Sequence, residues 1–586
     1  MYTVAVIFMV ACSQDKPKED VKDVIPFDEL LNNYNEEKLK LFPMEATFSG
    51  DNRYNDYLPN NLSQEFRDQL SDYYSSYKAA LENYTKDSLS ESQQLSYDVL
   101  KWECQINLDD LKYPMYLMPI NQMWTLNLVF GQFASGSSAQ PFNTVEDYTN
   151  WLKRVDDYIA WGDTAVANMK KGIEQGVVLP KSLIKKVIPQ LESLAGGEVE
   201  EHLFFTPAKN VPEGISEEDK TKIQADYKDM VKNKIIPLYN RMSEFVKGDY
   251  LAAGRESTGI DAFPFGKEYY QHQIKKYTTT SMTANEVFEL GKNEVARISA
   301  EMEEVKKQVG YEGDLKSFFD YVRNKPELMP FKKPEAVIAN FEAIHETMKP
   351  QLEKLFDKTP KTPFQVKRTE AFREASASAE YNQGSKDGSR PGTFYVPIPD
   401  ATKYNYYSDE SLFLHEAIPG HHYQISLQQE NEDLPEFRRT LWYSAYGEGW
   451  ALYSESLGKE LGLYTDPYQY FGMLGAEMHR AIRLVVDAGM HSQGWTREQA
   501  IEYSVANEAE SLESIEREIE RYMANPGQAL SYKIGQLKIR QLRAKASEAL
   551  GEKFNIREFH NIVLESGCIP LQLLENRIDA WIVSKQ

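Results

Sequence analysis

The chain has 586 residues, enough for a large core and, by size alone, for more than one domain. Its net charge of −23 at pH 7, with no basic cluster, excludes nucleic acid as an expected partner. Three cysteines, at positions 12, 104 and 568, are too few for a disulfide scaffold or a cysteine-rich zinc module. A disulfide between Cys104 and Cys568 and two free thiols both remain open.

Residues 1–25 have the pattern of a bacterial lipoprotein signal followed by a tether. The apolar run VAVIFMVA, residues 4–11, is too short to span a bilayer and ends directly before Cys12, as in a lipobox. We expect Cys12 to carry the lipid, and the polar residues after it to form a flexible tether. A buried N-terminal strand is the alternative. The expected location is the bacterial cell envelope, with Ser13 favouring the outer membrane and the lipid as the only membrane attachment.

Helical periodicity dominates the remainder of the chain. In the clearest case Thr283 and Glu286 form a capping box, and apolar residues then recur at helical spacing as far as Val309. Similar patterns predict helices near residues 66–84, 145–175, 219–247, 333–356, 453–461, 497–523 and 532–550. We therefore expect a mainly α protein, with an N-terminal helical region over 26–275 and a catalytic helical region over 276–586.

One segment, TFYVPIP, has β character and follows a Gly/Ser-rich run. Thr393–Val396 is a short β-prone run ended by Pro397, which is typical of an edge strand. An extended peptide could pair with such an edge, so Phe394 and Tyr395 are candidates for substrate contact. A plain connecting strand is the alternative.

The motif HEAIPGHH resembles the zinc-peptidase pattern H-E-x-x-H but has a longer spacing. His421 and His422 follow His415 by six and seven residues. On a straight helix six residues turn through roughly 600°, away from His415, and seven residues rise by roughly 10 Å. Neither histidine could then share a metal with His415.

Pro419 and Gly420 change that expectation. Proline removes a helical hydrogen bond and clashes with the preceding turn, and glycine gives the backbone freedom to bend. We expect a helix that bulges at this point. A Gly-His pair precedes the second ligand in many zinc peptidases, which favours His421 as ligand, with His422 as the alternative.

A third ligand is expected from the segment SAYGEGWALYSESLG. Catalytic zinc needs three protein ligands, an open position and a nearby carboxylate that activates water, the role expected of Glu416. Glu448 is the candidate ligand, and Glu455, seven residues later on the same helix face, is placed to support the site from behind. The alternative is that both are solvated surface acids. The expected cofactor is one Zn²⁺ per chain.

A polar stripe interrupts the apolar helix HRAIRLVVDAGMHSQGW. Arg480 and Arg483 are candidates to hold a substrate carboxylate, and Asp487 to orient His491 as a catalytic group. The alternative is an internal salt-bridge network, because charges on a buried helix need partners.

Hydrolysis through a tetrahedral intermediate needs a hydrogen-bond donor to the oxyanion. In ERYMANPGQALSYKIGQ, residues 520–536, the helix resumes after Pro526-Gly527 with Tyr532 near its beginning. Tyr532 is the first candidate for this donor and Tyr522 is the second.

The ordered motifs RPGTFYV, HEAIPGHHYQ, EGWALYSE, RAIRLVVDAGMHSQGWTREQAIEY and RYMANPGQALSYKIGQ resemble the bacterial family called domain of unknown function 885. The resemblance runs from about residue 26 to the C-terminus. It implies a zinc metallopeptidase distantly similar to the helical zinc carboxypeptidases, oligopeptidases and angiotensin-converting enzyme, with an α body split by a deep cleft. It implies His415, His421 and Glu448 as zinc ligands and Glu416 as the base.

The leading hypothesis is a zinc-dependent peptidase that hydrolyses short peptides, in the manner of a carboxypeptidase. Two other hypotheses remain: a metal-free, surface-anchored lipoprotein that binds peptides or glycans, and a zinc amidase acting on a non-peptide amide.

Overall fold

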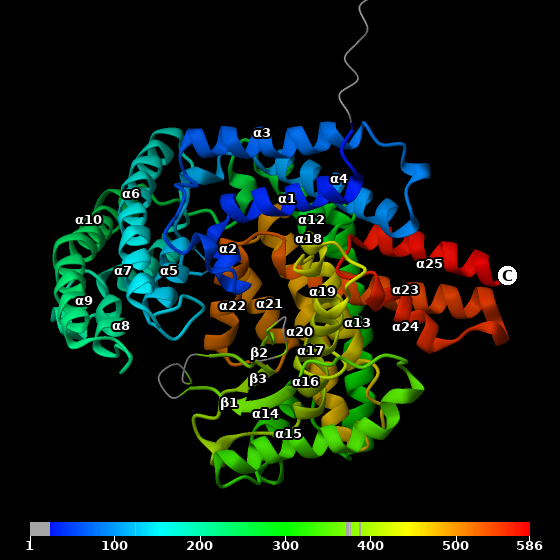
Figure 1. Cartoon of the computed structure of the whole chain (residues 1–586). Coiled ribbons are helices and arrows are strands. Elements are labelled where there is room, and N and C mark those ends of the chain that lie inside the picture. Colours follow the sequence, from blue (N-terminus) through cyan, green and yellow to red (C-terminus); the bar gives the residue numbers. More distant parts are fainter. Residues whose placement is uncertain (1–23, 124, 371–373, 375–376, 386–387, 389) are drawn as a thin grey trace, which may run out of the picture.

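A computed structural model describes residues 24–586 except 124, 371–373, 375–376, 386–387 and 389 (Figure 1). The predicted mainly α class is confirmed, because helices make up most of the described chain and strands form only one small sheet. The predicted lipidation site, Cys12, lies outside the described residues.

The described part of the first half consists of helices joined by loops and contributes no strand to the sheet. Its α-helices are α1 (Phe27–Leu41), α2 (Pro43–Phe48), α3 (Gln64–Leu81), α4 (Glu91–Asp110), α5 (Leu126–Ala134), α6 (Val145–Gln175), α7 (Lys181–Glu192), α8 (Thr206–Lys209), α9 (Glu217–Met230), α10 (Ile236–Phe245), α11 (Leu251–Ala253) and α12 (Gly266–Thr278).

The second half carries the sheet and the motifs described above. Its α-helices are α13 (Ala284–Gln308), α14 (Leu315–Arg323), α15 (Pro334–Met348), α16 (Asp409–Glu416), α17 (His421–Glu430), α18 (Glu436–Arg439), α19 (Ser444–Glu455), α20 (Pro467–Ser492), α21 (Arg497–Asn507), α22 (Leu512–Ala524), α23 (Ser531–Leu550), α24 (Ile556–Glu565) and α25 (Leu571–Lys585). In Figure 1, α16, α17, α19 and α20 lie near the centre, α1, α3 and α4 lie across one end, and α6–α10 gather at one side.

Several predicted helices agree closely with the structure. Helix α6 has the predicted bounds, and the capping box of α13 is formed, with the Glu286 amide donating to Thr283 Oγ1 at 3.3 Å and the Thr283 amide donating to Glu286 Oε2 at 2.7 Å. The predicted boundary between residues 275 and 276 falls within α12, which packs against helices of both regions.

Two helix predictions were inexact. The segment 497–523 forms two helices, because Ser511 caps a new helix by accepting a hydrogen bond from the Ser514 amide at 3.2 Å. The helix predicted over 453–461 ends at Glu455, and it begins earlier, at Ser444.

The sheet has the order β1-β3-β2, formed by Phe364–Arg368, Gly392–Val396 and Glu380–Asn382, with β3 parallel to β1 and antiparallel to β2. The predicted strand therefore exists, but it is central, and its prediction as an edge strand was wrong. Phe394 is fully buried and meets Phe341 edge-on at 5.2 Å between ring centroids, while Tyr395 is half-buried on the other face. Since both edges of β3 are paired, a substrate cannot add to it as expected.

Helices α19 and α23 cross at two glycines. A Cβ atom on Gly449 would lie 2.5 Å from Gly535 Cα, and one on Gly535 would lie 1.9 Å from the Ala445 carbonyl oxygen. This close approach places the first turns of both helices together, with Ser444 Oγ 2.7 Å from Ser531 Oγ.

Two further features concern the whole described chain. Cys104 and Cys568 are both buried and free, so they form no disulfide with each other. Within the described residues, no helix combines the length and apolar character needed to cross a membrane.

Candidate metal centre

The motif HEAIPGHH joins two separate helices. Helix α16 ends at Glu416, and α17 begins at His421. The chain turns through residues 417–420, and the Trp450 indole N–H holds this turn by donating to the Pro419 carbonyl at 2.8 Å. The expectation of one bulged helix was therefore wrong, and the break allows two histidines six residues apart to face the same point.

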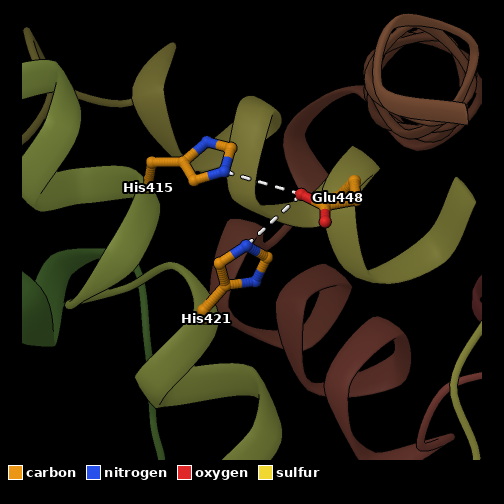
Figure 2. A group of neighbouring side chains, drawn as sticks. All are labelled: His415, His421 and Glu448. Atoms are coloured by element: carbon orange, nitrogen blue, oxygen red, sulfur yellow. Dashed lines mark ion pairs between the residues drawn. The ribbon is translucent and has the colours of Figure 1, made fainter. Parts of the chain in front are cut away.

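Three side chains of the predicted ligand set come together (Figure 2). Glu448 Oε2 lies 3.6 Å from His415 Nε2 and 3.3 Å from His421 Nε2, and one ligand atom from each residue lies within 4.8 Å of the others. Both histidines are buried, and Glu448 is half-buried. The imidazoles approach the carboxylate from two sides, from α16 and α17, while Glu448 comes from the first turns of α19.

These separations fit a shared metal ion. Two ligand atoms bound tetrahedrally to one zinc at its usual bond lengths are about 3.4 Å apart. The two measured separations bracket that value, and they are longer than a short charge-assisted hydrogen bond. The donor set of two imidazoles and one carboxylate is one that zinc accepts in catalytic sites.

His422 lies outside this group. Its Nδ1 is 3.0 Å from the Tyr381 hydroxyl, and its ring centroid is 4.9 Å from that of Phe364, so it packs against the small sheet. Burial lowers the pKa of His422 to about 4, which keeps the imidazole neutral. The structure thus places His421, and not the alternative His422, beside His415 and Glu448.

Glu455 supports His415 from behind, as its place on the helix face predicted. Its Oε1 lies 2.8 Å from His415 Nδ1, and its Oε2 accepts a hydrogen bond from Ser411 Oγ at 3.0 Å. A carboxylate on the second ring nitrogen fixes the tautomer and orientation of a metal-binding histidine, leaving Nε2 directed at the ion.

The charges of the site favour a bound cation, because three carboxylates surround two imidazoles. Burial opposes protonation of His415, but Glu448 and Glu455 outweigh it and raise the pKa of His415 to about 9. Burial also disfavours ionisation of Glu448, yet His421 and His415 hold the pKa of Glu448 well below its usual range.

Glu416 is the third of these carboxylates and has no hydrogen-bond or ion-pair partner among the described residues. Burial raises the pKa of Glu416, which His415 and His421 partly oppose. The Glu448 carboxylate adds to the rise in pKa, and Arg480 opposes it. A half-buried, unpartnered carboxylate beside the candidate ligands is available to accept and return a proton.

Arg480 borders a cavity of about 170 Å³ on the His415 side of the triad. The cavity is also lined by Glu455, His479 and Glu508. Arg480 donates from Nη1 to the carbonyl of its own helix at Ala476, at 3.2 Å, and its buried Nε has no partner among the described residues. No carboxylate of the described chain forms an ion pair with it, so its charge is available to an anionic ligand.

Arg483, one turn later, is already engaged. It donates from Nε to the Tyr522 hydroxyl at 2.9 Å and pairs from Nη2 with Glu518 at 3.0 Å. The Tyr522 hydroxyl in turn donates to Glu518 at 2.7 Å. For Arg483 the structure matches the alternative of an internal network, and Tyr522 has no free donor for an oxyanion.

Tyr532 remains open as the oxyanion donor. Tyr532 is half-buried, and the Arg483 guanidinium carbon lies 4.6 Å from the centroid of its ring. The Tyr532 hydroxyl accepts a hydrogen bond from Arg521 Nη2 at 3.5 Å. Its own proton is thus free to be donated. The neighbouring Ser531 touches Ser444, one turn before Glu448, which places this end of α23 beside the ligand helix.

The expected contact between Asp487 and His491 is not formed. Asp487 accepts from the Tyr270 hydroxyl at 2.7 Å and from the Gly527 amide at 3.1 Å. His491 is fully buried, with Nδ1 accepting from the Ile260 amide and Nε2 directed at the Tyr522 carbonyl, both at 3.0 Å. Because backbone groups occupy both nitrogens, His491 is a structural residue, and its expected catalytic role is not supported.

Sequence reasoning missed other charged residues of the site. His479 Nδ1 contacts Glu508 Oε2, and its Nε2 lies 3.6 Å from Glu518. Burial and Arg483 lower the pKa of His479, but Glu508 and Glu518 outweigh them, so the pKa is raised. His479 directly precedes Arg480 and could have been noticed. Glu508 and Glu518 lie in acidic surroundings that contain many similar residues, so no sequence signal separates them.

The fold and site together define a helical protein with a candidate metal centre of two histidines and one glutamate. The chain belongs to the family described as "Bacterial protein of unknown function (DUF885)", which matches residues 43–578. The family predicted from the motifs is thus confirmed. No curated protein matches the chain.

Two solved structures share the fold. The crystal structure of "the putative lipoprotein from Colwellia psychrerythraea" is 27% identical, with a TM-score of 0.86 over 95% of this chain and 99% of that one. A structure from Shewanella oneidensis, described in the same words and as of unknown function, is 18% identical, with a TM-score of 0.71 over 94% of this chain and 99% of that one.

Proposed function

We propose that this protein is a zinc-dependent metallopeptidase that hydrolyses short peptides bearing a free C-terminal carboxylate. The observation that carries the proposal is the spacing of the His415, His421 and Glu448 ligand atoms, with the unpartnered Glu416 carboxylate beside them. A metal-free binding protein has no use for this combination.

Each residue of the site has a separate role in the proposed reaction. A zinc ion held by the triad would supply a Lewis acid and lower the pKa of water to near neutrality. Glu416 accepts a proton from the attacking water and returns it to the leaving amine. Tyr532 donates a hydrogen bond to the oxygen on which negative charge develops.

Arg480 binds the terminal carboxylate of the substrate. It is preferred over Arg483 because it has no carboxylate partner in the described chain and lines the cavity that also borders His415. A guanidinium and a carboxylate form a strong, directional charge-assisted pair. A carboxypeptidase or a dipeptidase would use such a pair to fix the C-terminal end.

The metal is tested by mass spectrometry on the chain without residues 1–12, purified without chelators. We expect one zinc per chain in the wild type and in the His422→Ala variant, and none in His421→Ala. The two histidines are adjacent and both buried, so the pair controls for loss of a buried imidazole. No metal in the wild type, even after incubation with zinc, would favour the metal-free binding lipoprotein.

The reaction is tested with a peptide library beside amide-containing cell-wall fragments. Glu416→Gln should retain zinc and lose activity by about 10²–10⁴-fold, the usual contribution of a general base. Hydrolysis of the fragments alone would identify an amidase acting on a non-peptide substrate.

We also propose that Cys12 anchors the protein by a lipid in the cell envelope, at the outer membrane. Support comes from the apolar run before Cys12 and from the two similar structures, both described as lipoproteins. Metabolic labelling with a fatty acid should mark the wild type and not Cys12→Ser, which should instead fractionate without the membrane.

A further inference from the structure

Trp442 is an exposed aromatic residue directly beside the candidate metal centre. It lies between α18 and α19, 42% of its surface is exposed, and its ring centroid is 5.8 Å from that of His421. A single exposed aromatic residue is ordinary, but ligand sites are lined predominantly by hydrophobic and aromatic side chains, so its place beside a candidate ligand is what matters here.

The chain around Trp442 is fixed, although its indole is exposed. The neighbours Leu441 and Tyr443 are buried, the Tyr443 amide donates to Cys568 Sγ at 3.0 Å, and the Tyr443 hydroxyl donates to Glu103 at 2.7 Å. The exposure of Trp442 is therefore not that of a loosely attached loop.

The indole packs against helix α19 at Gly447. A Cβ atom on Gly447 would lie 2.1 Å from the tip of the ring, so the absence of a side chain there lets the indole lie directly on the helix backbone. Gly447 directly precedes the ligand Glu448. The same first turns of α19 thus position a metal ligand and an exposed aromatic surface.

Trp442 and Arg480 border the triad at different residues. Trp442 contacts His421, whereas Arg480 shares a cavity with His415. Trp442 does not line the cavity that Arg480 and His415 share, so the indole offers a second, separate surface beside the triad.

We propose that Trp442 forms the wall of a substrate subsite that selects a large apolar or aromatic side chain next to the scissile bond. The inference rests on the proposed function, and it names the substrate class of that site. An apolar side chain gains by covering exposed indole, and an aromatic one gains further from ring contact. A small or acidic side chain gains neither, and the nearby carboxylates repel an acidic one.

The test uses zinc-loaded chain and peptides of one length that differ at a single residue, Phe, Leu, Ala or Asp, on either side of the scissile bond. Trp442→Ala should lower kcat/KM for the Phe and Leu peptides by about 10-fold or more, and for the Ala peptide by less than about 2-fold. Trp442→Phe should keep most of the wild-type preference in kcat/KM for the Phe and Leu peptides over the Ala peptide. Tyr57→Ala, at a residue that is 44% exposed, is the matched control and should change nothing.

Peptide binding to the Glu416→Gln chain, measured by calorimetry, separates the two proposals. Trp442→Ala is therefore also made in the Glu416→Gln chain. If the wild type cleaves no peptide but Trp442→Ala selectively weakens binding of the Phe and Leu peptides in that chain, the subsite stands and the hydrolase proposal fails. An equal loss over the whole panel, no loss, or no binding of any peptide would overturn the subsite. Zinc content measured on each variant shows whether the metal centre was disturbed.

Discussion

Gly420 lies directly against the carbonyl group of His415. A Cβ atom at position 420 would be 1.9 Å from the His415 oxygen and 2.3 Å from that of Leu414. The turn that brings His421 back to His415 therefore depends on the absence of a side chain at this one position.

Gly420→Ala should push the two ligand helices apart. We expect loss of stoichiometric metal and a fall of roughly 2–4 kcal/mol in the free energy of unfolding, the range of severe steric substitutions. Metal analysis and urea unfolding measure both effects. Gly248→Ala is the control, because nothing lies within 4 Å of its Cβ position. Normal zinc content in Gly420→Ala would show that the close approach does not hold the ligands.

Glu455 should tune metal affinity without binding the metal. Glu455→Gln weakens the contact that orients His415, so the dissociation constant for zinc should rise about 10–100-fold. Competition with a chromogenic chelator measures this change. Glu460→Gln, which removes a carboxylate paired with Arg543 at 2.8 Å, should leave the affinity unaltered. Equal affinities for both variants would argue against a supporting role for Glu455.

The metal centre shows which parts of a site a sequence can predict. Residue types and helix-face spacing were enough to propose His415, Glu448 and Glu455, because those rules are local. The Gly-His pair favours His421 over His422, but the geometry that brings His421 to the site is not local. It depends on how residues 417–420 turn, and that turn is held by Trp450 from another helix.

The strand and the polar stripe show the same limit. The sequence predicts Thr393–Val396 as a strand, but its central place depends on β1 and β2, whose sequences FQVKR and EYN carry weak β signals. Arg480 and Arg483 look alike in sequence. Their different environments come from Glu518 and Tyr522 of α22, which no spacing rule connects to them.

Asp487 should make stability depend on pH. Burial raises the pKa of Asp487 to about 7, and the hydrogen bonds from Tyr270 and Gly527 oppose the rise only in part. Between about pH 4 and pH 7 the unfolded chain has released this proton while the native chain still holds it. The free energy of unfolding should therefore fall as pH rises through this window, by up to about 4 kcal/mol from this group, and then level off.

Asp487→Asn should remove this contribution. Urea unfolding of both proteins between pH 4.5 and pH 8 gives the difference in stability at each pH, which cancels the titration of groups common to both. We expect the wild type to lose stability relative to Asp487→Asn as pH rises to 7. A difference that does not vary with pH would mean that Asp487 is ionised in the native state throughout.

Replacing the two arginines of α20 by glutamine should affect different properties: stability for Arg483 and substrate binding for Arg480. Arg483→Gln removes a buried guanidinium that pairs with Glu518 and donates to Tyr522, while Arg521 Nη1 still lies 3.3 Å from Glu518. It should therefore lower the free energy of unfolding by about 1–3 kcal/mol, the usual value for a hydrogen bond to a charged group. Arg480→Gln breaks no ion pair and should change stability by less than about 1 kcal/mol.

The effect of Arg480→Gln should instead appear in catalysis, as a rise in KM of about 10-fold or more for peptides with a free C-terminal carboxylate and little change for the same peptides as C-terminal amides. Urea unfolding and steady-state kinetics on the paired substrates measure these effects. Equal losses on acid and amide would show that Arg480 does not bind the carboxylate, because a general disturbance of the site cannot distinguish the two substrates.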